Sequence, residues 1–350
     1  TDVAGVTVGH FTLVSGDSHT GPDWRPGNGP FRTGVTVILP HDGKLYEEKV
    51  AAAVHTVNGF GKVAGFEQVR ELGNIETPIA LTGTMNVPRV ADALMTIMAE
   101  QSPHIGVGFP ETGWSGYSSV NPVVGETSDG YLSDLQARPI GLAEVRAAMA
   151  AASAEVAEGA VGAGTGTSCY GWKGGIGTAS RVLSGDLGGY TVGALVQTNF
   201  GRAEELTICG VPVGRQLRPP TQRSSVDLGG SIMMVLATDA PLDARGLGRL
   251  CRRAAFGLAR TGSTCHGGSG DFVIAFSTTN RIADRPPMPP APRPVIDEQV
   301  IVSWLSVAVI ESIEEAIYNS LLMAETVTGR NGHVRHGLPA DEVARLVGDR

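Results

Sequence analysis

The chain has 350 residues, of which 42% are hydrophobic and 18% are charged, and its formal net charge is −8. This composition allows a sizeable core, which excludes a disordered or fibrous protein, and the negative charge disfavours nucleic acid and anionic membranes as partners. Glycine supplies 48 residues, about twice its usual share of ~7%, which indicates many tight turns and close backbone approaches.

The cysteines and the first residues bear on metal binding and location. Cys169, Cys209, Cys251 and Cys265 lie far apart without a C-x-x-C pair, so we expect reduced thiols and neither a zinc site nor a disulfide framework. No apolar run reaches the ~18 residues that a membrane span requires. The N-terminal residues show no basic segment followed by an apolar one, so we expect a cytoplasmic protein without a secretion signal. No motif indicates a cofactor.

The N-terminal third combines strand and helix patterns. Alternating apolar residues predict strands at Val35–Leu39 and Ile79–Thr82, and a short alternating segment predicts another strand at His104–Phe109. The segment Val90–Glu100 predicts an amphipathic helix, because its apolar residues recur at helical spacing. The expected buried face of this helix consists of Val90, Leu94, Ile97 and Met98.

The next region, Thr112–Tyr131, is rich in Gly, Ser, Trp and Tyr. That composition is typical of a binding loop as much as of an irregular connection. Glu126 lies within it, and a turn or helix-cap carboxylate is the more frequent role of such a residue. Trp114, Tyr117 and Tyr131 are candidates for pocket walls, although ordinary packing explains each of them equally well.

An Ala-rich segment, Gly141–Gly159, predicts a helix that buries one apolar face. The glycine-rich segment Gly162–Thr167 follows and superficially resembles a phosphate-binding loop. It lacks the Lys-Ser/Thr ending of such a loop and does not follow a strand, so nucleotide binding is disfavoured. Two closely apposed backbone segments near an active site explain these glycines better.

The segment Gly229–Asp239 is the stretch around which the chain is organised. A polar, Pro-rich segment changes here directly into a run of apolar and small residues that predicts a central strand, with Ser231 at its start. This pattern suits a chain that cleaves itself between Gly230 and Ser231. The new α-amine would have a pKa of about 7.7–8.0, close to the optimum for a general base. An ordinary Gly-Gly turn before a strand is the alternative, and it is common.

Asn199 ends a second predicted strand, Tyr190–Phe200. A side-chain amide at a strand end can donate a hydrogen bond to a developing oxyanion, or it can form a turn before the following glycine. Further along, a long turn that contains Ser269 and Asp271 leads into a predicted strand at Phe272–Ser277.

The remaining C-terminal segments carry weaker functional signals. His266 lies in the same long turn, where a solvent-facing loop histidine is more common than a catalytic base. Leu242–Arg260 predicts a helix, and Arg281–Val295, with six prolines, predicts a surface loop. Val300–Ser306 predicts a strand, and a helix containing Ile313, Ile317 and Leu321 follows it. The last twenty residues are polar and are expected to be peripheral.

Several blocks resemble the self-processing aminopeptidases, which comprise the L-aminopeptidase/D-amidase-esterases and the β-peptidyl aminopeptidases. The segment from Gly229 to Leu242 is similar to their nucleophile region. Six further blocks occur in the same order and span nearly the whole chain: Thr1–His10, Glu76–Thr82, Pro122–Thr127, Gly174–Arg181, Gly193–Gly201 and Ala324–Arg330. Each block alone is weak, but their common order makes the resemblance specific.

The many strands and Gly-rich turns predict a layered α+β fold. The resemblance implies a four-layer αββα sandwich, similar to that of the ornithine acetyltransferases. It also implies one domain over residues 1–350, self-cleaved into a large chain, 1–230, and a small chain, 231–350, and assembled as a homotetramer.

The resemblance further implies the roles of single residues. Ser231 is the nucleophile, Asn199 donates to the oxyanion, and Glu126 faces the ammonium of a small peptide, amide or ester. Ser269 and Asp271 form hydrogen bonds around the nucleophile, with Asp271 standing where some relatives have the longer Glu. No metal or cofactor is implied.

Two alternatives stay open. The same acyl-enzyme could transfer its acyl group to an amine, as in the ornithine acetyltransferases. The chain could also be a non-catalytic protein that binds small ligands and retains only the fold.

Overall fold

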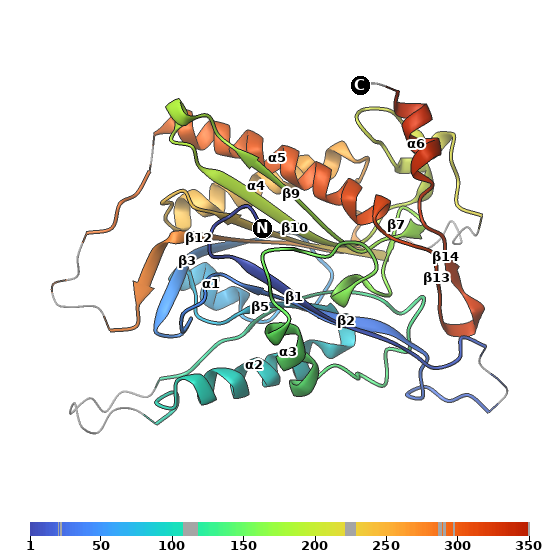
Figure 1. Cartoon of the computed structure of the whole chain (residues 1–350), viewed down its shortest axis with the longest axis horizontal. Helices are drawn as coiled ribbons and strands as arrows, with labels where there is room; N and C mark the ends of the chain where they lie inside the picture. The colour runs from blue at the N-terminus through green and yellow to red at the C-terminus, as the bar shows by residue number, and fades with distance from the viewer. Residues whose placement is uncertain are drawn as a thin grey trace.

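The computed structural model describes residues 1–19, 21, 23–107, 118–220, 229–285, 289, 292–296 and 298–348. Two β-sheets stack at its centre, and helices cover both outer faces (Figure 1). One sheet has four strands in the order β1-β2-β5-β6, and the other has six in the order β4-β3-β12-β11-β10-β9. The predicted four-layer αββα sandwich is confirmed.

The four-stranded sheet consists of β1 (Thr7–Ser15), β2 (Phe31–Leu39), β5 (Ile79–Gly83) and β6 (Val123–Thr127). Neighbouring strands are antiparallel except β5 and β6, which are parallel. Helices α2 (Val87–Gln101) and α3 (Leu142–Ala150) cover its outer face. All four residues predicted for the inner face of α2 are buried, so this prediction was correct.

The six-stranded sheet consists of β3 (Glu48–Gly59), β4 (Asn74–Ile75), β9 (Ile176–Val182), β10 (Thr191–Asn199), β11 (Gly229–Thr238) and β12 (Gly268–Ala283). Only β11 and β12 are parallel within it. Helices α4 (Ala244–Arg260) and α5 (Gln299–Leu322) cover its outer face. The Asp243 side chain caps α4 by accepting a hydrogen bond from the Gly246 N–H at 2.7 Å, which explains why the helix begins just after the predicted Leu242.

Shorter elements connect these layers. They are the helices α1 (Phe66–Leu72) and α6 (Ala340–Val347), the hairpin β7 (Ser168–Cys169) and β8 (Trp172–Lys173), and the hairpin β13 (Val327–Thr328) and β14 (Val334–Arg335). Short 3₁₀ turns are η1 (Thr84–Asn86), η3 (Gly162–Gly164), η4 (Gly185–Leu187), η5 (Ala203–Glu205), η6 (Val213–Arg215) and η7 (Arg330–Gly332).

Strand β11 lies in the middle of its sheet and is buried on both faces. Ile232, Met234 and Leu236 belong to the core under α4 and α5. Met233, Val235 and Ala237 belong to the core between the two sheets. A continuous apolar run is the pattern expected of such a strand, because successive side chains point to opposite faces and both faces are covered. The strand that follows Ser231 is therefore packed on both faces.

Three predicted segments differ in the structure. His104–Val107, the described part of the predicted strand His104–Phe109, forms turns, because its backbone hydrogen bonds are local ones such as Ile105 N–H to Ser102 O. The helix predicted over Gly141–Gly159 ends at Ala150, since the chain beyond it pairs with β1 through Val8 and Ser153. Within the predicted loop Thr112–Tyr131, the buried strand β6 carries Glu126.

Two C-terminal predictions were also wrong. Val300–Ser306 is not a strand but the beginning of α5, and its buried residues Val302 and Leu305 continue the helical stripe of Val309 and Ile313. The β-branched residues favoured a strand, but packing against the six-stranded sheet overrides that preference. The last twenty residues are not all peripheral, since Arg335 is fully buried.

The glycines of segment 162–167 are needed for close backbone approach, as predicted. A Cβ on Gly164 would lie 2.6 Å from the Ile176 nitrogen, and one on Gly166 would overlap the Arg32 carbonyl.

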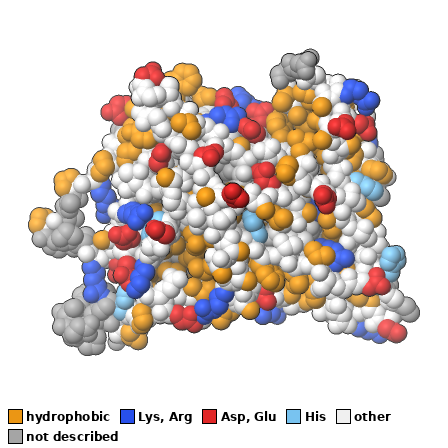
Figure 2. All heavy atoms as spheres, viewed as in Figure 1, with side chains coloured by type: hydrophobic (Ala, Val, Ile, Leu, Met, Phe, Trp, Pro, Cys, Tyr) orange, Lys and Arg blue, Asp and Glu red, His pale blue; other side chains and the backbone are white. Residues whose placement is uncertain are grey.

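Acidic and basic side chains are interspersed on the face shown in Figure 2. All four cysteines are free thiols. None of the helices in the described residues is long and apolar enough to span a membrane.

Candidate active site

Ser231 lies at the start of β11 and is buried. Its register partners are Asn199 at the end of β10 and Gly270 on β12. The Ser231 hydroxyl donates a hydrogen bond to the carbonyl oxygen of Gly230 at 2.5 Å. The hydroxyl thus lies beside the peptide bond whose cleavage the sequence predicts.

Gly230 occupies a crowded position next to this serine. A Cβ there would come within 3.2 Å of the Phe200 backbone and of the Ser269 hydroxyl oxygen. A side chain at this position would displace one of these groups, so the lack of space for a Cβ explains why residue 230 is glycine. The Ser269 hydroxyl therefore lies close to Gly230.

Ser269 and Asp271 form a buried pair at the start of β12. The Ser269 hydroxyl donates to Asp271 Oδ1 at 2.6 Å. Burial raises the pKa of the Asp271 carboxyl, and the hydrogen bond from Ser269 opposes this effect. A carboxylate with a raised pKa is a better proton acceptor, so the pair can receive a proton through the serine. The shorter Asp side chain is long enough for this contact.

Asn199 presents its side-chain amide at the end of β10. Its Oδ1 atom accepts the backbone N–H of Ser168 at 2.9 Å, in a buried position. Because the oxygen is used in this way, the amide nitrogen remains to donate to a ligand. Such a donor beside the nucleophile is what an oxyanion requires.

Glu126 lies on the buried strand β6, across the cavity that Ser231 and Asn199 also line. Its Oε1 atom accepts the backbone N–H of Lys62 at 2.9 Å. The Lys62 ammonium in turn donates to Thr84 Oγ1 at 2.9 Å. Burial raises the pKa of Glu126, and the Lys62 contacts oppose the rise. The site therefore holds a poorly solvated carboxylate, which can pair with a ligand cation.

The cavity has a volume of about 570 Å³. Its described lining consists of Gly59, Phe60, Gly61, Lys62, Thr84, Glu126, Ser128, Asn199, Gly230, Ser231 and Gly268. The nucleophile candidate, the amide donor and the carboxylate are thus brought together from β11, β10 and β6. Ser269 and Asp271 lie behind this wall as the register neighbours of Gly230 and Ile232.

Other predicted residues lie elsewhere. Trp114 and Tyr117 are outside the described residues. Tyr131 is not among the described residues that line the cavity, and its ring stacks on His333 with the centroids 4.5 Å apart. His266 contacts Glu205 through Nε2 and Oε1 at 3.0 Å. Sequence reasoning missed Lys62, because a lysine after a glycine-rich turn has no distinguishing pattern.

The chain is similar to known proteins over nearly its whole length. The family model of peptidase family S58 matches residues 1–335. The chain belongs to peptidase family S58. It is 40% identical to a β-peptidyl aminopeptidase, BapA, of Sphingosinicella xenopeptidilytica, over 99% of this chain and 86% of that protein. It is 28% identical to an uncharacterized aminopeptidase of Mycobacterium leprae, over 94% of this chain and 91% of the relative.

Solved structures of similar proteins share the fold. The PH0078 protein of Pyrococcus horikoshii superposes with a TM-score of 0.89 at 46% identity, over 99% of this chain and 92% of that one. The L-aminopeptidase D-Ala-esterase/amidase of Ochrobactrum anthropi, a serine aminopeptidase with a variant of the Ntn-hydrolase fold, superposes with a TM-score of 0.86 at 34% identity, over 99% and 92%. The resemblance seen in the sequence is confirmed, and this S58 member is a hydrolase of the aminopeptidase class.

A buried charged cluster lies behind Asn199 in this S58 chain, and sequence reasoning missed it. The Lys173 ammonium is fully buried and donates to the carbonyls of Gly164 and Gly174 at 2.8 and 2.5 Å. Burial lowers the pKa of Lys173 to about 7 and raises that of nearby Asp129 to about 6. Within the described residues, no group of three or more His, Cys, Asp or Glu side chains could hold a metal ion.

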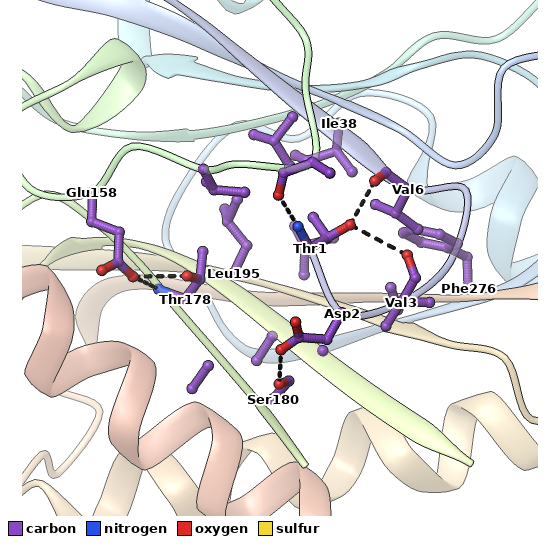
Figure 3. A pocket seen from close by; sticks show the side chains of 18 residues that line it. Thr1, Asp2, Val3, Val6, Ile38, Glu158, Thr178, Ser180, Leu195 and Phe276 are labelled. Atoms are coloured by element: carbon purple, nitrogen blue, oxygen red, sulfur yellow. Dashed lines mark hydrogen bonds between the residues drawn. The ribbon is translucent and has the colours of Figure 1, made fainter. Parts of the chain in front are cut away.

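A second cavity, of about 240 Å³, lies between the two sheets toward the other end of β11. Figure 3 shows its lining, in which Glu158 accepts hydrogen bonds from the backbone and hydroxyl of Thr178. Val235 and Ala237 of β11 contribute to its mainly apolar wall. None of the predicted catalytic residues is among the described residues that line this second cavity.

Proposed function

We propose that this family member is an N-terminal-serine aminopeptidase whose nucleophile, Ser231, is freed by self-cleavage after Gly230. The observation that carries the proposal is the meeting of Ser231, Asn199 and Glu126 at one cavity. These three groups supply a nucleophile, an oxyanion donor and a partner for a substrate ammonium. The α-amine of the mature chain serves as the general base, so no histidine is required.

The first reaction is an N-to-O acyl shift in the uncut chain. The Ser231 hydroxyl oxygen attacks the Gly230 carbonyl carbon, and the C–N bond to Ser231 breaks as an ester bond forms. The hydroxyl proton passes through Ser269 to Asp271 and then to the departing Ser231 nitrogen. Water hydrolyses the ester, which leaves a carboxylate on Gly230 and a free amine on Ser231.

The second reaction uses that new amine. It accepts the Ser231 hydroxyl proton while the oxygen attacks the carbonyl carbon of the substrate, and the proton then goes to the leaving amine. The amide of Asn199 donates to the tetrahedral oxyanion, and donors of this kind contribute roughly 2.7–4 kcal/mol to the transition state. Water releases the acyl group and restores the serine.

The substrates are small peptides, amides or esters with a free amine. Glu126 supports the requirement for the amine, because a poorly solvated carboxylate gains most from a cationic partner. The similar proteins carry the names β-peptidyl aminopeptidase and L-aminopeptidase D-Ala-esterase/amidase. We therefore include β-aminoacyl and D-alanyl substrates in the proposed class. A panel of L-, D- and β-aminoacyl anilides, with and without an added amine acceptor, distinguishes hydrolysis from acyl transfer.

Intact mass spectrometry tests the nucleophile directly. The wild-type protein should give fragments 1–230 and 231–350, and Ser231→Ala should remain one inactive chain. Ser277→Ala is the matched control, because Ser277 is also a buried serine on the same sheet but lies far along β12. It should process normally. A fully active wild-type enzyme found as one uncut chain would refute the proposal.

We also propose that processed chains assemble as a homotetramer. Val300, Trp304 and Val307 form an exposed apolar stripe on α5, with exposed fractions of 62%, 50% and 40%. Association between copies would cover such a stripe. Light scattering should give four times the mass of one processed unit, and Trp304→Glu should reduce it. A monomeric wild-type protein contradicts the assembly.

A further inference from the structure

We propose that Arg335, acting through Ser168, fixes the Asn199 amide in the orientation that binds the oxyanion. Arg335, on strand β14, would then be a positioning residue of the active site. This inference rests on the proposed oxyanion role of Asn199. It goes beyond that role because it assigns a task to residues that do not touch the cavity.

Ser168 contacts Asn199 directly. A side-chain amide can rotate so that either its oxygen or its nitrogen faces a ligand. An oxygen facing the oxyanion would repel it, and only the nitrogen can donate. The Ser168 backbone N–H donates to Asn199 Oδ1 at 2.9 Å. A donor of this kind can pair with the amide oxygen but not with the amide nitrogen, which is itself a donor. The position of this one N–H therefore selects the productive orientation.

Ser168 is in turn held by Arg335. It belongs to the two-residue strand β7, which pairs only with β8 and is too short to be rigid by itself. Arg335 Nε donates to the Ser168 hydroxyl at 2.9 Å, and both residues are buried. A hydrogen bond from a charged donor is stronger and shorter than one between neutral groups. This bond therefore restrains the residue that orients Asn199.

Arg335 is itself held by an aromatic ring. Its guanidinium carbon lies 3.5 Å from the centroid of the Tyr131 ring, a cation–π contact that is worth most where water is excluded. Tyr131 stacks on His333, whose Nδ1 lies 2.9 Å from the Tyr131 carbonyl oxygen. The backbone N–H of Lys173 on β8 donates to the His336 carbonyl at 2.8 Å. The hairpin is thus fixed both to the segment after β6 and to the β7–β8 hairpin.

This arrangement gives Tyr131 a different place from the predicted pocket wall. Tyr131, five residues after Glu126 in the sequence, contacts Arg335, and Arg335 holds Ser168. A fully buried guanidinium is costly to desolvate, so its surroundings are tightly constrained. The same constraint makes it suitable for holding a neighbouring group in one position.

The test is a double-mutant cycle on processed enzyme, with activity normalised to the amount of Ser231 N-terminus found by mass spectrometry. Ser168→Ala keeps the N–H but removes the acceptor of the Arg335 bond. We expect kcat to fall about tenfold, less than the ~10²-fold expected for Asn199→Ala, because the donor is misplaced and not removed. KM should change less than about twofold, since the donor acts in the transition state.

The energetic coupling between Ser168→Ala and Asn199→Ala distinguishes a positioning role from a general structural effect. In the Asn199→Ala background, Ser168→Ala should lower kcat by less than about twofold, because the residue it positions is absent. Arg335→Lys is the second variant, and it should lower kcat in the same way. Arg32→Lys is its matched control, because Arg32 is buried and its Nε donates to Thr328 of the same hairpin without contacting Ser168. It should leave kcat unchanged.

Two results would overturn the inference and leave the proposed function intact. One is an unchanged kcat in Ser168→Ala, and the other is an equal loss of kcat with and without Asn199. If Asn199→Ala itself leaves kcat unchanged, the oxyanion role and the positioning role both fail. A loss of kcat in Asn199→Ala distinguishes the first two outcomes, which spare the proposed function, from the third.

Discussion

Asp129 offers a test of how the buried charges behind the active site affect stability. It follows β6 and is fully enclosed. Burial raises its pKa from 3.8 to about 6, and the Glu126 charge adds to this effect, whereas Thr33 and Lys173 oppose it. The perturbation is Asp129→Asn, which keeps the size of the side chain and removes the titration. We make it in the uncut Ser231→Ala chain, so that unfolding involves one polypeptide.

The sign of the effect follows from which state loses its proton first. Below about pH 3 the carboxyl is protonated in both the folded and the unfolded state, so it contributes no penalty. As the pH rises from about 4 to 6, the unfolded state ionises first and is favoured. A pKa difference of about 2 corresponds to about 3 kcal/mol at ~1.36 kcal/mol per pKa unit. The full penalty is reached only above the folded pKa, so the aspartate protein should lose about 2 kcal/mol of stability between about pH 4 and 6.5 relative to the asparagine variant.

The assay is urea unfolding followed by tryptophan fluorescence, with both proteins measured at several pH values from about 4 to 6.5. The upper limit avoids the titration of Lys173, whose pKa is lowered to about 7. The quantity of interest is the difference in unfolding free energy between the two proteins. A difference that stays constant over this range, or that changes in favour of aspartate, would refute the reasoning.

Three further predictions concern the site and the packing of the sheet. Glu126→Gln should lower kcat/KM for aminoacyl anilides about 30-fold, because losing a buried charge partner costs ~2 kcal/mol or more. The loss of activity at low pH that accompanies protonation of Glu126 should also vanish. A change in kcat/KM below about twofold would contradict the role of Glu126 as the partner of the substrate ammonium. Asp271→Asn should slow self-cleavage about 10²-fold in a time course followed by mass spectrometry, and an unchanged rate excludes it as the proton acceptor. Gly177→Ala should lower the unfolding free energy by about 3 kcal/mol in urea, because its Cβ would overlap the Ala316 carbonyl on α5. Gly193→Ala is the control and should lower the unfolding free energy far less, since its Cβ meets only a side-chain methyl at 3.1 Å. Equal losses of stability in the two variants would contradict this prediction.

The sequence alone determined the central elements and the chemical candidates. The apolar run after Ser231 could only be satisfied by a strand covered on both faces, and β11 has that environment. Helix α2 followed from helical spacing, because its buried stripe is local information. Ser231, Asn199 and Glu126 were found through ordered motifs, and the structure brings these three residues to one cavity.

Other features depended on contacts between segments far apart in the chain. The start of α5 carries residues that favour strands, and only packing against the six-stranded sheet makes it helical. The predicted helix after Gly141 stops early because Ser153 pairs with β1. Neither partner is visible from the local sequence, since propensity describes a segment without its neighbours.

The polar environment of the site was decided by tertiary structure for the same reason. Arg335 is an ordinary charged residue in a polar C-terminal segment, and its burial depends on Ser168 and Tyr131, which lie more than a hundred residues away. Lys173 is stable inside the protein because glycine carbonyls converge on it. A buried charge is tolerated only where partners satisfy it, and those partners are assembled by the fold.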